Sequence, residues 1–337
     1  MEYCGLDLGR RSSRYCVVDN GRDVVQEGNV RTHKTHLRRV FSKREPMRIV
    51  VEATTACFWV ADQLIELGHD VRVVDPNQTK AIGAALIKHD KLDARVLAQL
   101  CAADLLAEVR IPTLEQRLGR MPLTARDVLV RSRTRIVNCI RGMLASEGFV
   151  LPSTSPKRLV SLLDEEPPPD IPPALYAALV PLLEALVGLE ANIEASTAPV
   201  YELAKTDPVL RRLQTVPGVG PITASLFVSA IGDPHRFRSG RAVGAYLGLV
   251  PRLYQSGATL RRGRITKHGN AQARWALTIS ANALLLSKKD SALQRWAQNL
   301  VERIGRQKAC CAIARKLASV LWSLWKNEQS FQAFAPN

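Results

Sequence analysis

The sequence lacks the cysteine patterns of a disulfide scaffold or a zinc site. Its 337 residues include seven cysteines, an odd number, with no C-x-x-C pair and no His/Cys cluster at zinc-ligand spacing. Secreted disulfide-rich proteins usually carry even sets of paired cysteines, whereas cytosolic thiols are kept reduced. The pattern therefore predicts reduced thiols in a cytoplasmic protein.

A signal region and a long uninterrupted apolar run are also lacking. Met1 leads directly into a strand-like run, without the basic and apolar regions of a secretory signal. The most apolar stretch, residues 174–189, is short for a bilayer span and contains Pro181 and Glu184. These features predict a cytoplasmic protein with no membrane partner.

Acidic residues are scarce in the last part of the chain. Residues 205–337 contain 21 Lys and Arg but five Asp and Glu, whereas residues 1–204 contain 26 of each kind. The whole net charge of +16 therefore lies in the C-terminal part. Such a positive field suits phosphate backbones, and a membrane surface fits less well because the cations follow no single amphipathic stripe. We predict that residues 205–337 bind nucleic acid.

The first hundred residues alternate between strand-like and helical patterns. Strands are predicted at residues 3–8, 14–19, 22–30, 48–52 and 69–75. Helices are predicted at residues 31–44, 57–67 and, for the most part, 77–103. A three-strand meander followed by alternating helices and strands is typical of an α/β ribonuclease H-like fold. A Rossmann domain fits less well because no G-x-G-x-x-G follows the first strand.

The middle of the chain is predicted to form a helical coiled-coil hairpin. Residues 114–147 have a basic helical pattern, and the Pro- and acid-rich residues 151–173 indicate a loop or elbow. Apolar residues then recur at the 4-3-4-3-4 spacing of a coiled-coil seam. The seam consists of Leu175, Leu179, Leu182, Leu186, Leu189 and Ile193. Two interpretations stay open, a helix buried within its own chain and a hairpin used for dimerisation.

Four carboxylates occupy positions where a charge is costly unless it is paired or bound to metal. Asp7 lies within the apolar first strand, Glu52 ends the fourth, and Asp90 and Asp93 share one helix face. In a ribonuclease H-like sheet these strands are neighbours, and the last helix packs across them. Converging oxygen ligands favour Mg²⁺, with Mn²⁺ as an alternative, and two such ions can stabilise the attacking and leaving oxygens of a phosphodiester. Alternatively, the same residues are solvated charges at element ends.

The basic part begins with a motif typical of a helix-hairpin-helix. Residues 212–232 read as a helix, a PGVGP turn and a second helix. Gly218 and Gly220 would let backbone amides approach a phosphate at the positive end of the second helix. We predict sequence-independent DNA binding there, although a plain tight turn remains the alternative.

A hydroxyl nucleophile is predicted next to a dense basic cluster. Ser256 and Tyr254 both qualify by chemistry, because nearby cations would neutralise charge that develops on an attacked phosphate. A serine in a glycine-containing turn can also serve only as a cap. The predicted phosphate-binding residues are Arg252, Arg261, Arg262, Arg264, Lys267 and His268.

These motifs together resemble a known family. GLDLG, VVEAT, KHDKLDAR, VPGVGP, GLVPRLYQSG and ITKHGN are similar, in this order, to motifs of the DEDD transposases of insertion sequences related to Piv-type DNA invertases. The resemblance implies a RuvC-like N-terminal domain whose acidic set falls on Asp7, Glu52, Asp90 and Asp93. It also implies a C-terminal transposase domain with Ser256, rather than Tyr254, as nucleophile.

The resemblance extends to partners and organisation. Family members are understood as recombinases guided by a structured bridge RNA that pairs with donor and target DNA. Local departures are Thr266, where serine is frequent, and Thr55, where glycine is common. The expected domains are a catalytic domain at 1–105, a coiled-coil and dimerisation segment at 106–204, and a transposase domain at 205–337.

These expectations describe a nucleoid-associated homo-oligomer. It is expected to be a dimer that becomes a tetramer in the synaptic complex. Two other functions remain possible on the residues alone. One is a RuvC-like junction nuclease that hydrolyses DNA with Mg²⁺ and does not use Ser256. The other is a nucleic-acid-binding protein without catalysis, in which the four carboxylates are structural.

Overall fold

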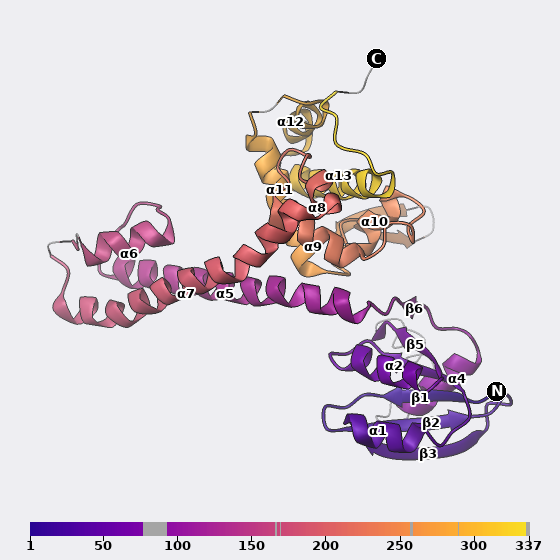
Figure 1. Cartoon of the computed structure of the whole chain (residues 1–337). Coiled ribbons are helices and arrows are strands. Elements are labelled where there is room, and N and C mark those ends of the chain that lie inside the picture. Colours follow the sequence, from indigo (N-terminus) through magenta and orange to yellow (C-terminus); the bar gives the residue numbers. More distant parts are fainter. Residues whose placement is uncertain (77–92, 166, 169, 257–258, 289, 335–337) are drawn as a thin grey trace. The chain divides into compact units, whose positions relative to one another are not determined.

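The computed structural model describes residues 1–76, 93–165, 167–168, 170–256, 259–288 and 290–334 (Figure 1). The chain divides into two compact units, residues 1–113 and 114–337. The second unit contains both the middle helices and the basic C-terminal part.

A six-stranded mixed sheet with the order β3-β2-β1-β4-β5-β6 forms the centre of the N-terminal unit. The strands are β1 (Tyr3–Asp7), β2 (Ser12–Val18), β3 (Val24–Arg31), β4 (Arg48–Glu52), β5 (Asp70–Val74) and β6 (Glu108–Val109). Strand β4 runs parallel to β1 and β5, and the other pairings are antiparallel. This ribonuclease H-like order agrees with the prediction, which missed only the two-residue β6 among these strands.

Helices cover both faces of this sheet. Among the described residues, the helices of the unit are α1 (Lys34–Phe41), α2 (Cys57–Glu66) and α4 (Asp93–Ala102). One core joins Cys4 and Leu6 of β1 to α1 and α2. On the other face, residues such as Cys16 and Val50 contact α4. Strand side chains alternate between these two cores because successive residues of a strand point to opposite faces. The first part of the helix predicted at 77–103 lies outside the described residues.

A helical hairpin opens the second unit, with helices α5 (Leu114–Ser146), α6 (Pro156–Asp164) and α7 (Pro173–Thr206). Leu179 and Leu186 of the predicted seam are buried in one cluster with Ile140 of α5 and Leu159 of α6. The seam therefore packs within one chain, and dimerisation through the hairpin stays a prediction. The expectation of a loop throughout 151–173 was wrong, because Ser155 caps α6 by accepting from the Arg158 amide.

Helix α7 is longer than its sequence pattern indicated. By length and composition alone it could cross a membrane, with a mean hydropathy of 1.7 in its most apolar window. Pro181 and Pro199 lie within the helix and do not end it. Since the core helices of soluble proteins pass the same test, one such helix is weak evidence for a membrane span.

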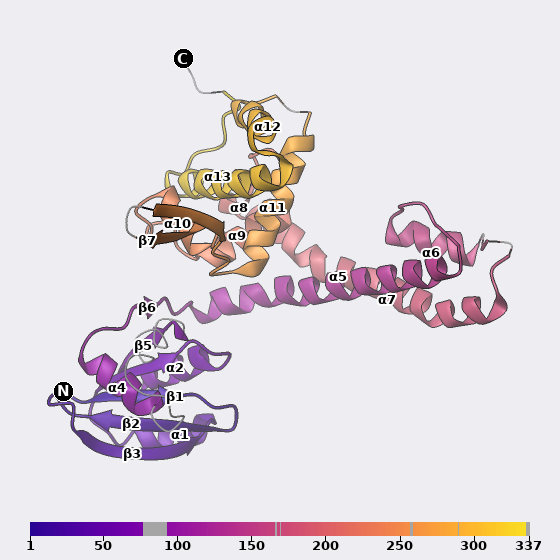
Figure 2. The same cartoon turned by 180° about the vertical axis from the view of Figure 1, so that it is seen from behind.

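The rest of the second unit is mainly helical and shares one core. Its elements are α8 (Pro208–Leu213), α9 (Pro221–Ile231), α10 (Gly240–Tyr246), β7 (Pro251–Ser256), β8 (Thr259–Ile265), α11 (Ala271–Leu286), α12 (Ala292–Ile304) and α13 (Arg306–Lys326). Phe227 of α9, Leu277 of α11 and Leu317 of α13 are fully buried in this core. The antiparallel β7–β8 hairpin was not predicted, and Figure 2 shows it beside α10.

Candidate functional site

Asp7 and Glu52 end neighbouring parallel strands. Leu6 of β1 pairs with Val51 of β4, so the next residue of each strand is one of the two carboxylates. Adjacent strands lie about 4.8 Å apart. Both acidic residues are half-buried at this edge of the sheet. The structure therefore brings these two predicted site residues together.

The two carboxylates face the side of the sheet that α4 covers. Gly5 lies two residues before Asp7, and a Cβ added to Gly5 would be 2.0 Å from the Ala94 carbonyl oxygen. Val50, two residues before Glu52, is buried with Leu97 of α4. Because side chains two apart in a strand share a face, Asp7 and Glu52 point the same way as Gly5 and Val50.

The described part of helix α4, which includes Asp93, lies on this face. Helix α4 starts at Asp93, directly before Ala94, whose carbonyl approaches Gly5. The side chain of Asp93 and the whole of Asp90 lie outside the described residues. The backbone thus places the start of α4 over β1 and leaves the convergence of all four carboxylates as a prediction.

The donor set on this face fits an oxygen-preferring cation. Among the described residues, no group of three His, Cys, Asp or Glu side chains could hold a metal ion, and half of the predicted ligand set falls outside them. Burial raises the pKa of Cys16 to about 11 and that of Cys101 to about 12, so both stay neutral thiols. Asp7 and Glu52 supply carboxylate oxygens on this face, the donor type that oxygen-preferring divalent cations take. No disulfide bond forms among the cysteines that the structure describes.

The PGVGP turn joins α8 to α9, as the sequence predicted, but its two glycines differ in environment. Gly218 has φ +84°, and an added Cβ would lie 2.6 Å from the Ser280 carbonyl oxygen and 2.7 Å from the Leu284 amide nitrogen of α11. Gly218 is thus required for packing of the turn against α11. Gly220 precedes α9 and has open space where a Cβ would be. The predicted approach of a phosphate fits Gly220 better.

Ser256 is the last residue of β7. Its backbone pairs with Thr259 of β8, and Tyr254 pairs with Arg261. A Cβ added to Gly263 would be 2.9 Å from Cε2 of Tyr254, so the tyrosine ring covers the glycine on the opposite strand. Tyr254 therefore has a packing role in the hairpin. The side chain of Ser256 lies outside the described set.

Exposed cations lie on the strands of this hairpin and directly after β8. The predicted phosphate-binding residues with described side chains are Arg252, Arg261, Arg264, Lys267 and His268, and all five are exposed. None of them forms an ion pair with another residue that the structure describes. The side chain of Arg262 is outside the described residues. These cations are available to an anionic partner.

The base of the hairpin is fixed by a close crossing of two chain segments. Gly248 (φ +69°) and Gly269 (φ +76°) leave no room for a Cβ. A Cβ added to Gly248 would lie 2.2 Å from the His268 carbonyl oxygen, and one added to Gly269 would lie 2.1 Å from the Tyr246 carbonyl oxygen. Arg274 donates from Nη1 to the carbonyl oxygens of Leu247, His268 and Gly269 at 3.2, 2.8 and 3.1 Å. The sequence analysis did not identify Arg274. The feature that could have pointed to it is its position as a cation in the first turn of the helix that follows ITKHGN.

Two family models match the chain. A model described as the transposase IS116/IS110/IS902 family matches residues 210–297, which include the hairpin with Ser256. A DEDD transposase model matches residues 4–147, which include the sheet with Asp7 and Glu52. A domain of the DEDD type implies a divalent metal ion.

Relatives match over nearly the whole length. The "Probable family 20 transposase" of Pseudomonas aeruginosa is 31% identical over 334 residues, which cover 97% of this chain and 98% of the relative. The transposase for insertion sequence element IS1111A of Coxiella burnetii is 27% identical, with 98% and 91% covered. The transposase for insertion sequence element IS1328 of Yersinia enterocolitica is 27% identical, with 94% and 95% covered. The chain is therefore a transposase, a DNA strand-transferring enzyme, and belongs to the IS110/IS116/IS902 family.

Proposed function

We propose that this transposase cuts and rejoins DNA through a serine-linked intermediate formed by Ser256. The supporting observation is the β7–β8 hairpin, where Ser256 ends β7 and the exposed cations on and next to the hairpin form no ion pair with a described carboxylate. The choice of Ser256 over Tyr254, whose ring lies next to Gly263 and which is 56% exposed, rests on the family resemblance. A serine close to unpaired cations is suited to attack on a phosphodiester, because those cations neutralise the charge of the transition state.

The proposed chemistry conserves the phosphodiester bond. The Ser256 oxygen bonds to phosphorus as the bond to one strand end breaks, and that end leaves as a hydroxyl with a proton replacing the one lost by serine. A hydroxyl from a different strand then attacks the serine-linked phosphate. This second attack forms the new phosphodiester and returns the proton to Ser256. No ATP is required, because each step exchanges one phosphate ester for another.

Asp7, Glu52, Asp90 and Asp93 are proposed to hold Mg²⁺, with Mn²⁺ as a substitute. A bound divalent ion would stabilise the attacking and leaving oxygens at the phosphate. The support from the structure is the pair Asp7 and Glu52, which share an edge and a face of the sheet where α4 begins. We propose that the metal ion held by these carboxylates assists the strand exchange carried out by Ser256.

The proposed nucleic-acid partners are donor DNA, target DNA and a structured bridge RNA. The positive charge of residues 205–337 supports phosphate binding, which we assign to Gly220 and to the predicted cations of the hairpin. Gly218 would contribute indirectly by holding the turn against α11. The guide role of an RNA rests on the family resemblance. We place this activity in the cytoplasm, at the nucleoid.

The active form is proposed to be a homo-oligomer, with dimers joining into a tetramer in the synaptic complex. The support is an exposed apolar stripe on α5 at the spacing of a coiled-coil seam. Leu114, Leu118, Met121 and Val128 are 60%, 50%, 61% and 58% exposed. The 175–193 seam already contacts α5 and α6 of the same chain, so this stripe is the better dimer surface.

Hydrolysis by a RuvC-like metal site is the competing function. Water would then replace the serine, and Ser256 would be dispensable. Strand exchange between two DNA substrates should be measured with the full-length protein, Mg²⁺ and the element's non-coding RNA. We expect Ser256→Ala to abolish exchange while nucleic-acid binding persists, and Tyr254→Phe to retain activity. Parental exchange rates in Ser256→Ala would refute the serine chemistry.

A further inference from the structure

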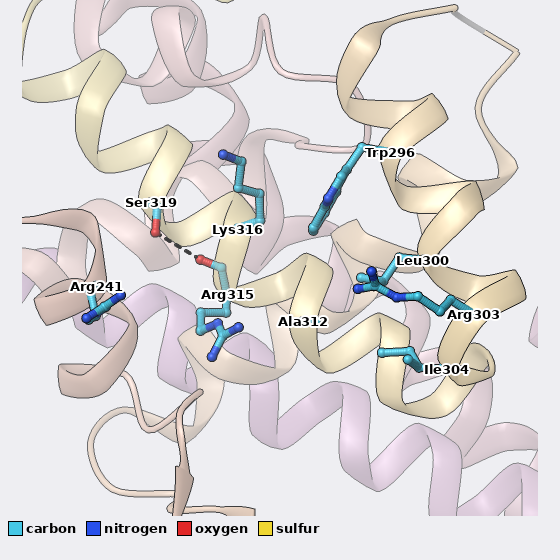
Figure 3. Close-up of a pocket in the computed structure, with 9 residues that line it drawn as sticks. All are labelled: Arg241, Trp296, Leu300, Arg303, Ile304, Ala312, Arg315, Lys316 and Ser319. Carbon is cyan, nitrogen blue, oxygen red and sulfur yellow. Dashed lines mark hydrogen bonds between the residues drawn. The ribbon is translucent and has the colours of Figure 1, made fainter.

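A second group of cations lies between α10, α12 and α13. Here the structure forms a groove of about 580 Å³, a volume typical of small-ligand pockets. Figure 3 shows the side chains that line it, with Trp296 on α12 and Lys316 on α13 extending into the same region. Four of the nine lining residues are cations, namely Arg241, Arg303, Arg315 and Lys316.

Regular helical spacing places these groups together. On α12, Trp296, Leu300 and Arg303 follow one another at intervals of four and three residues, so they share one helix face. On α13, Ala312, Arg315 and Lys316 line the groove in the same way. The two helices therefore present an aromatic ring and cations from opposite walls.

Close packing of α10 on α13 fixes one wall. A Cβ added to Gly240 would lie 2.6 Å from Cβ of Ser319, and one added to Gly244 would lie 3.0 Å from Cγ of Arg315. The Ser319 hydroxyl donates to the Gly240 carbonyl at 3.0 Å. The stem of Arg315 is thus held against Gly244, which leaves its guanidinium exposed.

The groove is positive and has an accessible aromatic surface. Its lining contains no carboxylate among the residues that the structure describes, and none of the four cations forms an ion pair with a described residue. Trp296 is 39% exposed, although a tryptophan next to an apolar core is usually more buried. Cations that track a phosphate backbone beside an aromatic ring that stacks on a base are the usual elements of a single-strand-binding surface.

We propose that this groove binds a single-stranded nucleic acid, with one unpaired base stacked on Trp296 and the flanking phosphates on Arg315, Lys316, Arg241 and Arg303. Duplex DNA fits less well because its bases are stacked on one another and their faces are not available to Trp296. None of the lining residues belongs to the β7–β8 hairpin, and the groove adds a binding function to the strand-joining chemistry. A binding measurement tests it independently of catalysis.

The experiment measures binding of fluorescein-labelled 12-mers to the full-length protein by anisotropy over a range of salt concentrations. The probes are oligo-U, oligo-dT and a duplex of the same length. We expect Trp296→Ala to weaken single-strand binding by about 5- to 150-fold, the range for loss of one base–aromatic stack, with duplex binding unchanged within about twofold. Arg315→Ala with Lys316→Ala should reduce the slope of log K against log salt by about 1.4 for single strands. A preference for oligo-U or for oligo-dT identifies the strand as RNA or DNA.

Two matched variants control for general effects. Trp275→Ala removes another exposed tryptophan, from α11, and Arg295→Ala removes a cation of α12 that is paired with Asp290 outside the groove. Both should leave single-strand affinity within about twofold of the parent. Photocrosslinking of 5-iodouridine oligonucleotides should modify the peptide 296–303. Unchanged affinity in Trp296→Ala, or equal losses for duplex and single strand, would overturn the proposal.

Discussion

At the scale of single residues, the sequence identified Asp7 and Glu52 as candidate site residues, and the structure showed that they lie next to each other. Asp7 and Glu52 were recognisable because each is a charge at an apolar strand, where burial is costly. Their adjacency follows from the parallel register of β1 and β4, which no local pattern encodes. In contrast, Arg274 looks like an ordinary helical cation in the sequence, and only the chain crossing at Gly248 and Gly269 gives it three carbonyl partners.

A first prediction concerns the metal-binding carboxylates. Asp7→Asn and Glu52→Gln should each reduce the rate of strand exchange by more than about 100-fold. Mutation of a residue that only supports a metal ligand typically lowers activity by about 10- to 100-fold, and loss of the ligand itself should lower it further. Tm should rise with Mg²⁺ in the parent and less in the variants, since bound ligand stabilises only the folded state. Glu66→Gln, an exposed acid at the end of α2, is the control. Parental activity in either site variant would make these carboxylates structural.

A second prediction concerns His69, which is buried between β4 and α1. Its Nδ1 accepts from the Met47 amide at 3.3 Å, and its Nε2 lies 3.2 Å from the Phe41 carbonyl oxygen. Burial holds the pKa of His69 below its usual value of 6.5, and the nearby Arg44 acts in the same direction. Below pH 6.5 the unfolded chain therefore binds a proton at His69 more readily than the folded chain does. The free energy of unfolding falls as the pH drops through this range. Tm should decrease from pH 7.5 to 5.5, and His69→Gln should show a smaller decrease. Equal pH dependence in both proteins would contradict this role.

At the scale of elements, the strands and long helices were predictable and the short or irregular ones were not. The meander and the helix at 114–147 follow from hydrophobic periodicity. Helix α6 was missed because its neighbours are rich in proline, although Ser155 and Pro156 form a normal helix start. The β7–β8 hairpin was missed because its strands carry arginines and glycine instead of alternating apolar residues, and Leu253 is 62% exposed.

A third prediction tests how α4 is fixed over β1. Gly5→Ala should lower the free energy of unfolding by about 1–3 kcal/mol, as for overpacking of a core. The reason is that its Cβ would meet the backbone of Ala94 and Ala98 at 2.0 and 2.5 Å. The matched control is Gly142→Ala in α5, where a Cβ meets nothing within 4 Å and should stabilise the helix by up to about 1 kcal/mol. Urea unfolding measures both effects, and an unchanged midpoint for Gly5→Ala would show that α4 can shift freely.

At the scale of the whole molecule, charge was the most informative property of the sequence. Residues 1–113 carry a net charge of +2 and residues 114–337 one of +14, so the two compact units differ strongly in electrostatics. The sequence located this asymmetry because it depends only on composition. It could not locate the Trp296 groove, since the lining residues come from three helices whose packing depends on Gly240 and Gly244.

A fourth prediction concerns assembly through the exposed stripe of α5. Met121→Asp with Val128→Asp should convert oligomers into monomers, because two carboxylates would be buried in an apolar interface. Leu203→Asp is the control, since this exposed leucine lies on α7 outside the stripe. Light scattering measures the mass of each protein, and strand exchange should be lost with the oligomer. A parental mass for the double variant would exclude this surface as the dimer contact.

The fifth prediction tests the central claim, that strands are exchanged through an ester on Ser256. The full-length protein should be incubated with Mg²⁺, its guide RNA and a nicked DNA substrate whose released end diffuses away, which leaves the intermediate trapped. Denaturing gels should then show protein attached covalently to DNA, and mass spectrometry should map the attachment to Ser256. Ser256→Ala should give no adduct, and Tyr254→Phe should give the parental amount. Cleaved DNA without any adduct, or an adduct on Tyr254, would contradict the serine mechanism.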